Sequence, residues 1–165
     1  MDEQEFDAFY TGSYRRVTGQ VYAMIGDLDE AQECVQEAFA RAWQHRRTLR
    51  RTEHPEAWVR TTAYRLAVSR WRKVVRSRRD PDRAVSARLE SPDLSPDHVA
   101  LVQALRQLPE AQRRAIVLHH LADLPVADVA AEVGAPEGTV KARLSRGRTA
   151  LAALLTDTLP GGSHA

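Results

Sequence analysis

Apolar residues recur along this chain at intervals of three and four, and almost nowhere at intervals of two. This period is typical of amphipathic α-helices, whereas half-buried strands need alternation. The first half of the pattern predicts helices over about residues 2–25, 28–47 and 55–79. Their expected inward residues are Phe6, Phe9, Tyr10, Tyr14, Val17, Val21 and Met24, then Leu28, Ala31, Val35, Ala38, Phe39, Ala42 and Trp43, then Trp58, Thr61, Tyr64, Val68, Trp71 and Val75.

Turn residues separate these helices from one another. Gly26 and Asp27 break the first helix from the second, and Asp27 followed by Glu30 has the spacing of a capping box. A basic loop is expected over residues 46–54, and Pro55 suits the start of the third helix.

The second half of the chain predicts shorter helices. Residues 80–95 contain Pro81 and Pro92 and lack a sustained apolar period, which indicates a linker. The period then returns and predicts four helices, near 96–107, 109–121, 125–133 and 136–155. The expected fold is therefore all-α, with two small helical domains (1–79 and 96–157), a flexible linker (80–95) and a disordered tail (158–165).

The segment from Pro125 to Arg148 has the pattern of a helix-turn-helix. The apolar stripe of its first helix consists of Val126, Val129, Ala130 and Val133. Gly134 follows the stripe, where a helix end takes the left-handed conformation, and Pro136 suits the first position of the next helix.

The second helix of this motif has an apolar face and a basic face. Val140 and Leu144 are four residues apart and should face the core. At about 100° per residue, the outward face then contains Gly138, Lys141, Ala142, Ser145 and Arg146. Small residues allow close approach to a DNA groove, and basic ones reach phosphates and base edges. A plain helical hairpin with a solvated face is the alternative, and the basic residues without intervening acids favour nucleic acid.

Charge is distributed unevenly along the 165 residues. Residues 1–40 carry nine acidic and two basic side chains, residues 41–88 carry fifteen basic and four acidic ones, and the whole chain has a net charge of +2. A basic middle behind an acidic front indicates that the middle meets a polyanion and the front meets something else.

Composition excludes several classes of protein. The sequence has one cysteine, Cys34, so no disulfide can form within the chain, which suits a reducing compartment. No apolar run is long enough for a membrane span, and the acidic N-terminus lacks signal-peptide order, so we expect a cytoplasmic protein without membrane insertion. His119 and His120 are adjacent and leave a helix in different directions, so no metal is expected. Neither a catalytic set nor a phosphate loop appears, and we expect no enzyme and no cofactor.

Three segments resemble the extracytoplasmic-function (ECF) group of bacterial sigma factors. They are DEAQECVQEAFARAW (29–43), PEAWVRTTAYRLAVSRWRK (55–73) and LPEAQRRAIVLHHLADLPVADVAAEVGAPEGTVKARLSRGRTAL (108–151). Their order and spacing match the conserved segments of that family across nearly the whole chain outside the linker and tail.

The resemblance implies a promoter-specificity subunit of RNA polymerase. The front, sigma2-like domain would bind the β′ coiled coil of the core enzyme and open the −10 element, and the rear, sigma4-like domain would read the −35 element and meet the β flap. The partners implied are therefore core RNA polymerase, double-stranded promoter DNA, the melted −10 strand and an anti-sigma factor.

The resemblance also assigns residues to three surfaces. The core-polymerase-binding row is Glu33, Gln36, Glu37 and Arg41. The −10 DNA-binding set on the third helix is Arg60, Arg65, Arg70, Arg72, Lys73 and Arg76. The −35 DNA-binding set is Gly138, Thr139, Lys141, Ala142, Arg143, Ser145, Arg146 and Arg148. The aromatic residues of the third helix fall on its apolar stripe and are expected in the core rather than on unstacked bases.

The third helix departs from the family pattern. Where the family has an Ala-Arg-Asn triplet and a later aspartate, this chain has Ala63-Tyr64-Arg65 and Ser69, so the family's −10 preference does not carry over in detail. The 46–54 loop, where the family captures a flipped base, is basic here and has no aromatic residue. Two other functions remain open: a stand-alone helix-turn-helix regulator and a protein–protein adaptor.

Overall fold

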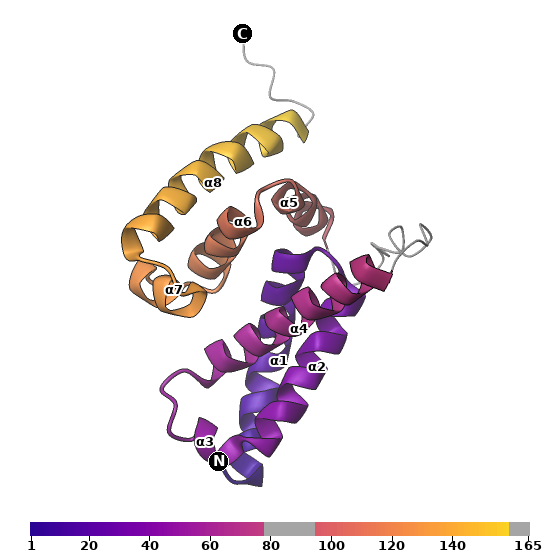
Figure 1. Ribbon diagram of the computed structural model, residues 1–165, viewed down its shortest axis with the longest axis vertical. Helices are drawn as coiled ribbons and strands as arrows, with labels where there is room; N and C mark the ends of the chain where they lie inside the picture. Colours follow the sequence, from indigo (N-terminus) through magenta and orange to yellow (C-terminus); the bar gives the residue numbers. More distant parts are fainter. Residues whose placement is uncertain (78–94, 159–165) are drawn as a thin grey trace. The chain divides into compact units, whose positions relative to one another are not determined.

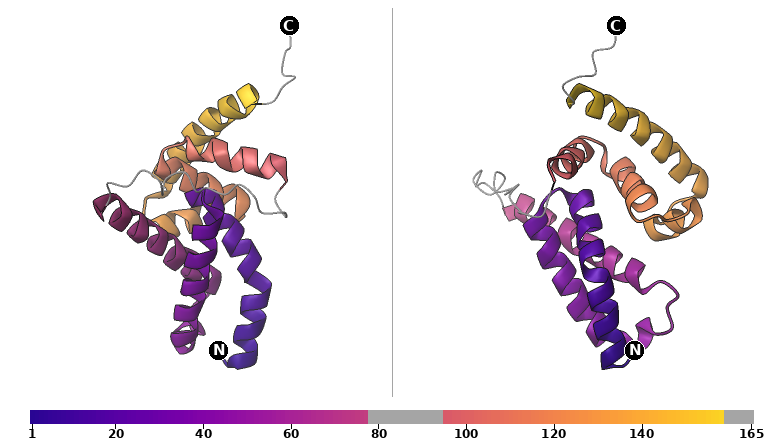
Figure 2. Two further views of the ribbon diagram at one scale, coloured as in Figure 1. Left: turned by 90° about the vertical axis from the view of Figure 1, so that its right-hand side faces the viewer. Right: turned by 180° about the vertical axis from the view of Figure 1, so that it is seen from behind.

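The computed structural model describes residues 1–77 and 95–158, and every regular element within these ranges is a helix (Figures 1 and 2). The expected all-α fold is confirmed. The first range contains α1 (Glu3–Ile25), α2 (Leu28–Gln44), α3 (Arg46–Leu49) and α4 (Pro55–Ser77). The second contains α5 (Pro96–Arg106), α6 (Glu110–Ile116), the π-helical turn η2 (Val117–Leu121), α7 (Val126–Val133) and α8 (Glu137–Thr158).

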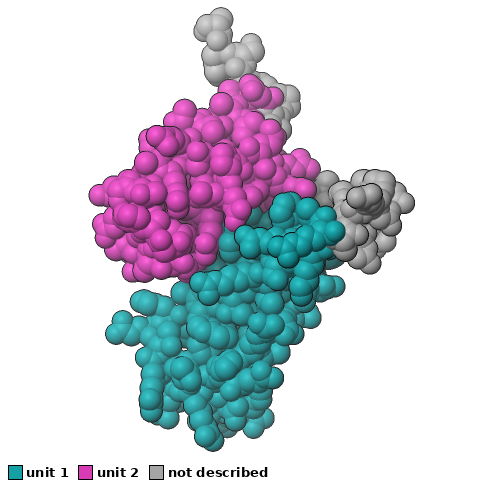
Figure 3. Space-filling model, in the orientation of Figure 1, with its two compact units in different colours: residues 1–88 teal, residues 89–165 magenta. Residues whose placement is uncertain are grey.

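The chain divides into two compact units, unit 1 (residues 1–88) and unit 2 (residues 89–165), which are coloured separately in Figure 3. Apart from Ser95 and Thr158, the predicted linker and tail fall on residues 78–94 and 159–165, which lie outside the described residues. The domain boundaries drawn from the sequence therefore stay predictions.

Local caps set the ends of α1 and α2. The complete capping box is at Asp2: its carboxylate accepts from the Glu5 backbone N–H at 2.8 Å, and the Asp2 N–H donates to the Glu5 carboxylate at 3.0 Å. Gly26 ends α1 in the left-handed conformation (φ 79°). At the second expected box only half forms: Asp27 accepts from the Glu30 N–H at 3.1 Å, while the Glu30 carboxylate lies near Arg70 instead.

The core of unit 1 lies where α1, α2 and α4 pack together. Val17, Val21 and Met24 of α1 are buried, as the pattern predicts. The predicted inward stripe of α4 is wrong in its second half, because Trp71 and Val75 are 66% and 50% exposed. The buried face of α4 instead consists of Val59, Arg60, Ala63, Tyr64 and Ala67.

Small side chains explain the orientation of α4. Ala63 and Ala67 are four residues apart and let the backbone of α4 lie close to its neighbours, so more main-chain and Cβ surface is packed. The Arg16–Glu56 ion pair also ties α1 to the first turn of α4. The small residues of α4 thus make its buried face, and the larger Trp71 ring stays exposed.

The segment after α2 also differs from the prediction. Helix α2 ends at Gln44, and the short helix α3 occupies the first part of the expected 46–54 loop. Leu49 in α3 is buried, and the Arg46 guanidinium lies 4.1 Å from the centre of the Trp43 ring. An apolar anchor and a cation–π contact thus fold part of the basic segment back onto unit 1.

Unit 2 contains the predicted helix-turn-helix as α7 and α8. Gly134 ends α7 in the left-handed conformation (φ 70°), and Val129, Val140 and Leu144 are buried. Pro136 precedes α8, and its carbonyl accepts from the Val140 N–H at 3.1 Å. Helix α6 packs against α8, where a Cβ on the buried Gly147 would lie 3.0 Å from Ile116 Cγ1.

Candidate functional site

The outward face of α8 is polar, small and basic. Val140 and Leu144 hold the opposite face in the core, 0% and 2% exposed. This orientation leaves exposed Gly138, Thr139, Lys141, Ala142, Ser145, Arg146 and Arg148, with Arg143 half-buried. The structure therefore brings seven of the eight predicted −35 residues to the surface of one helix.

One end of this face is joined to η2. The Arg148 Nε–H donates to His120 Nε2 at 3.0 Å, and the His119 and His120 rings lie 4.8 Å apart between centroids. Burial, then Arg148, then His119 lower the pKa of His120, so the neutral imidazole is favoured. Sequence reasoning did not assign His120 a role, because the contact depends on how η2 packs beside α8.

Helix α2 carries the predicted polar row on its surface. Gln36 is exposed and donates from Nε2 to the Tyr14 hydroxyl at 3.3 Å. Arg41 and Glu37 form an ion pair at 3.2 Å, with both side chains about half exposed. The row is therefore accessible; Glu37 and Arg41 are paired within α2, whereas Glu33 is paired with Arg70 of α4.

An apolar hollow of about 400 Å³ adjoins this row. It is lined by Phe6, Tyr10, Gln36, Phe39, Ala40, Trp43 and Gln44, which come from α1 and α2. Trp43 and Tyr10 were expected inward, but they are 36% and 38% exposed. No local signal in the sequence marks this hollow, because it depends on how α1 packs beside α2.

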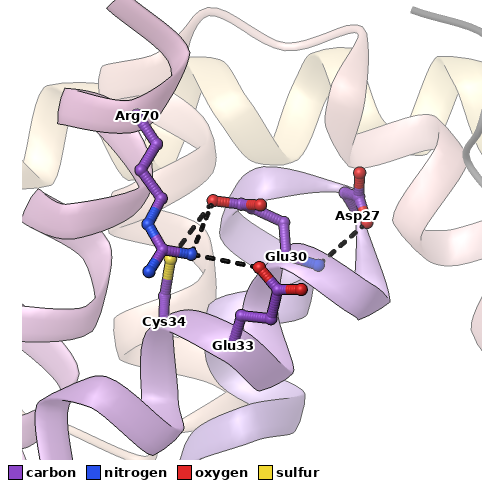
Figure 4. Close-up of polar contacts among 5 residues, drawn as sticks. All are labelled: Asp27, Glu30, Glu33, Cys34 and Arg70. Carbon is purple, nitrogen blue, oxygen red and sulfur yellow. Dashed lines mark hydrogen bonds and ion pairs between the residues drawn. The ribbon is translucent and has the colours of Figure 1, made fainter. Parts of the chain in front are cut away.

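A charged cluster joins α2 to α4 (Figure 4). Arg70 Nη1 lies 3.5 Å from Glu30 Oε1 and 3.2 Å from Glu33 Oε2. The Cys34 thiol donates to Glu30 Oε1 at 3.4 Å. Burial and the neighbouring Glu30 carboxylate raise the pKa of Cys34 to about 12, so the thiol stays protonated.

The predicted −10 residues on α4 divide into three groups. Arg65, Arg72, Lys73 and Arg76 are exposed. Arg70 is engaged with Glu30 and Glu33, as described above. Arg60 is the correction: it is 2% exposed, and its Nη1 donates to the Gln20 side-chain oxygen at 3.0 Å inside unit 1. A guanidinium held in the core cannot also lie on the DNA-binding surface.

The exposed cations of α4 form a row. Arg65, Arg72 and Arg76 are seven and four residues apart, so they share one face of the helix. Trp71 and Val75 make an exposed apolar edge beside this row. Of the three aromatic residues expected in the core, Tyr64 is buried, Trp58 is half-buried and Trp71 is exposed.

Across residues 1–77 and 95–158, no three His, Cys, Asp or Glu side chains gather closely enough to hold a metal ion. Within the same ranges, the helices fall short of the length and apolar character that crossing a membrane demands.

Comparison with known proteins identifies the family. The model of sigma-70 region 2 matches residues 9–79, and that of sigma-70 region 4 matches residues 98–151. The RNA polymerase sigma-H factor of Pseudomonas aeruginosa is 30% identical, covering 91% of this chain and 86% of that protein. The ECF RNA polymerase sigma factor SigL of Mycobacterium tuberculosis is 32% identical, covering 73% of this chain and 72% of that protein.

A solved structure agrees with these relatives. The sigma factor RpoE of Bartonella quintana, crystallised with the anti-sigma factor NepR, superposes with a TM-score of 0.80 at 25% identity, covering 94% of this chain and 99% of that one. The chain therefore belongs to the ECF group of the sigma-70 family and is an alternative sigma factor that directs transcription initiation.

Proposed function

We propose that unit 2 reads the −35 element with the outward face of α8. The observation that carries this proposal is the burial of Val140 and Leu144, which turns Ala142, Ser145 and Arg146 outward. In this arrangement Ala142 and Ser145 allow the helix to approach the groove floor, Arg146 reaches base edges, and Arg143 and Arg148 serve phosphates on the flanks.

Unit 1 contacts the −10 element through α4. The row of Arg65, Arg72 and Arg76, with Lys73 beside it, binds the DNA backbone. The exposed Trp71 is the stacking surface for an unpaired base, a role that the sequence had favoured for none of the aromatic residues. Arg60 is excluded from this surface by its burial.

The face of α2 binds core RNA polymerase. Glu33, Gln36, Glu37 and Arg41 supply its polar rim, and the hollow beside Trp43 supplies an apolar centre. Protein–protein interfaces commonly have aromatic residues at the centre and polar residues around them, and the central aromatic residues contribute most of the binding energy. Trp43 would be such a central residue here. The hollow thus adds an apolar component that a merely solvated helix face would lack.

The location and the regulatory partner of the protein follow from its role as a sigma factor. The protein acts in the cytoplasm, where polymerase and promoter DNA meet, and it contributes recognition rather than a catalytic step of its own. An anti-sigma factor is its regulatory partner, a proposal supported by the structural relative that was crystallised with NepR.

The test uses two substitutions in opposite units. Ala142→Glu places bulk and negative charge on the outward face of α8, and Glu37→Lys reverses a charge on α2. We expect Ala142→Glu to abolish transcription from −35-dependent promoters while core binding is retained. Glu37→Lys should weaken core binding at least tenfold while the helical content is retained.

Matched controls separate these effects from charge alone. Ala152→Glu adds the same charge to an exposed site later on α8, and Asp157→Lys reverses a charge near its end. Both controls should transcribe and bind core like the parent. Normal transcription by Ala142→Glu would refute DNA reading by α8. Tight, specific promoter binding by the chain without polymerase would favour the stand-alone regulator.

A further inference from the structure

The link between His120 and Arg148 has a defined direction. A guanidinium can only donate hydrogen bonds, so His120 Nε2, 3.0 Å from Arg148 Nε, must act as the acceptor. His120 is therefore neutral in this contact and carries its proton on Nδ1. Because Nε is occupied, the two terminal amino groups of Arg148 stay available on an exposed side chain. Those two groups can bind a phosphate end-on in a bidentate manner.

The backbone of η2 directs His120 toward α8. The Ala122 N–H donates to the Val117 carbonyl at 3.0 Å, a five-residue step that places one extra residue in the turn. His120 lies inside this widened turn, and its ring reaches Arg148 on α8. The neighbouring His119 Nδ1–H donates to the Leu124 carbonyl at 2.8 Å, which fixes the loop that leaves η2. These two hydrogen bonds fix the backbone on both sides of His120, and so they limit where its imidazole can lie.

Arg148 lies on the flank of α8 where a DNA backbone would pass. It is seven residues after Lys141, so the two cations lie on the same flank, two turns apart. Both side chains are exposed. Such a pair spans successive positions along one phosphate backbone when the helix occupies a groove.

We propose that His120 is a positioning residue, which holds the Arg148 guanidinium with its terminal amino groups toward the DNA backbone and does so only as a neutral imidazole. This inference rests on the proposed −35 reading by α8. A free arginine side chain loses rotamer freedom when it binds a phosphate, whereas one already held beside His120 loses less. Protonation of His120 removes the acceptor and places a cation against Arg148.

The groups that shift the pKa of His120 are few. After burial, they are Arg148 on α8 and His119 on η2 itself. Helices α6 and α7 also pack against η2, but none of their charged residues is among the causes of the shift; these residues are Glu110, Arg113, Arg114, Asp128 and Glu132. Burial is the first of these causes, and the Arg148 guanidinium is the second.

The experiment measures the affinity of holoenzyme for promoter DNA that carries a −35 element. His120→Ala should weaken binding about threefold to fivefold, the scale of one modest hydrogen bond. His120→Gln, which restores an acceptor oxygen, should stay within about twofold of the parent. In an Arg148→Ala background, His120→Ala should have no further effect. Between pH 7.5 and 5.5 the parent should lose more affinity than His120→Gln.

The alternative outcomes are distinct. In one of them, His120→Ala lowers DNA affinity by the same factor in the parent and in the Arg148→Ala background. That result would show that His120 contributes only to the fold, and it would overturn the inference. Tighter binding by the parent than by His120→Gln at pH 5.5 would also overturn it, because the imidazolium would then contact phosphate itself. If Ala142→Glu and Arg148→Ala both left affinity unchanged, the −35 proposal would fail instead.

Discussion

Arg70 Nη1 on α4 lies 3.2 Å from Glu33 Oε2 on α2. The pair joins the helix proposed to contact −10 DNA to the helix proposed to contact core polymerase. Glu33 is 68% exposed and Arg70 40%, so the pair contributes no more than about 1 kcal/mol to stability. Because this ion pair is weak, Arg70 or Glu33 can leave it to form a stronger contact with DNA or with core polymerase.

The first prediction concerns this exchange. Replacing both acids, in Glu30→Gln/Glu33→Gln, should release Arg70 for a phosphate. The salt dependence of −10 DNA binding by holoenzyme should then steepen by about one unit in the log–log slope. Adding Arg70→Ala should remove that gain. If Arg70→Ala alone lowers the slope of the parent, Arg70 already contacts DNA and the exchange does not occur.

The second prediction separates two arginines on α4. Arg60→Ala should lower the free energy of unfolding by about 1–3 kcal/mol, because the buried Gln20 oxygen loses a charged donor. Arg65→Ala, at an exposed site on the same helix, should leave stability unchanged and weaken DNA binding. Chemical denaturation and DNA titration of the two variants measure both effects. Equal stability of Arg60→Ala and the parent would contradict the role assigned to Arg60.

The third prediction concerns the seam between α6 and α8. Gly147→Ala places a Cβ 3.0 Å from Cγ1 of the buried Ile116, so overpacking of about 1–3 kcal/mol should exceed the helix-propensity gain of about 0.5–1 kcal/mol. Gly138→Ala meets nothing within 4 Å and should not destabilise. Thermal unfolding compares the two. A more stable Gly147→Ala would mean that Ile116 can move aside freely.

The fourth prediction is a pH dependence of stability. Folding lowers the pKa of His120, so the unfolded chain binds this proton more readily than the folded chain. Stability should therefore fall as the pH drops below about 6.5, the usual value for the unfolded side chain, until the folded pKa is passed. His120→Gln lacks this component, and its melting temperature should fall less between pH 7.5 and 5.0. Equal decreases in the two proteins would argue against the shift.

Unit 2 could be predicted from the sequence because its signals are local. A stripe such as Val126, Val129 and Val133, a glycine at a left-handed helix end, and buried Val140 and Leu144 each depend on a few neighbouring residues. These features also fix which face of α8 points outward. The sequence could therefore predict which residues of α8 are exposed, while their reading of the −35 element stays a prediction.

The orientation of α4 could not be predicted in the same way. The sequence pattern favours its largest apolar residues, Trp58, Trp71 and Val75, whereas packing in unit 1 selects Val59, Ala63 and Ala67. That choice depends on how close α1 and α2 lie, which no property of α4 alone reveals. The π-helical turn that directs His120, and the hollow beside Trp43, likewise arise from packing between elements.

The Cys34 thiol described within the α2–α4 cluster bears on whether oxidants can act directly on this protein. Oxidants such as peroxides attack thiolates, and this side chain is fully buried with a pKa of about 12. It is also the one cysteine in the sequence, so no resolving thiol within the chain could form a disulfide with it. In the folded sigma factor this thiol is thus shielded from oxidants, and its oxidation would require local unfolding around α2 and α4.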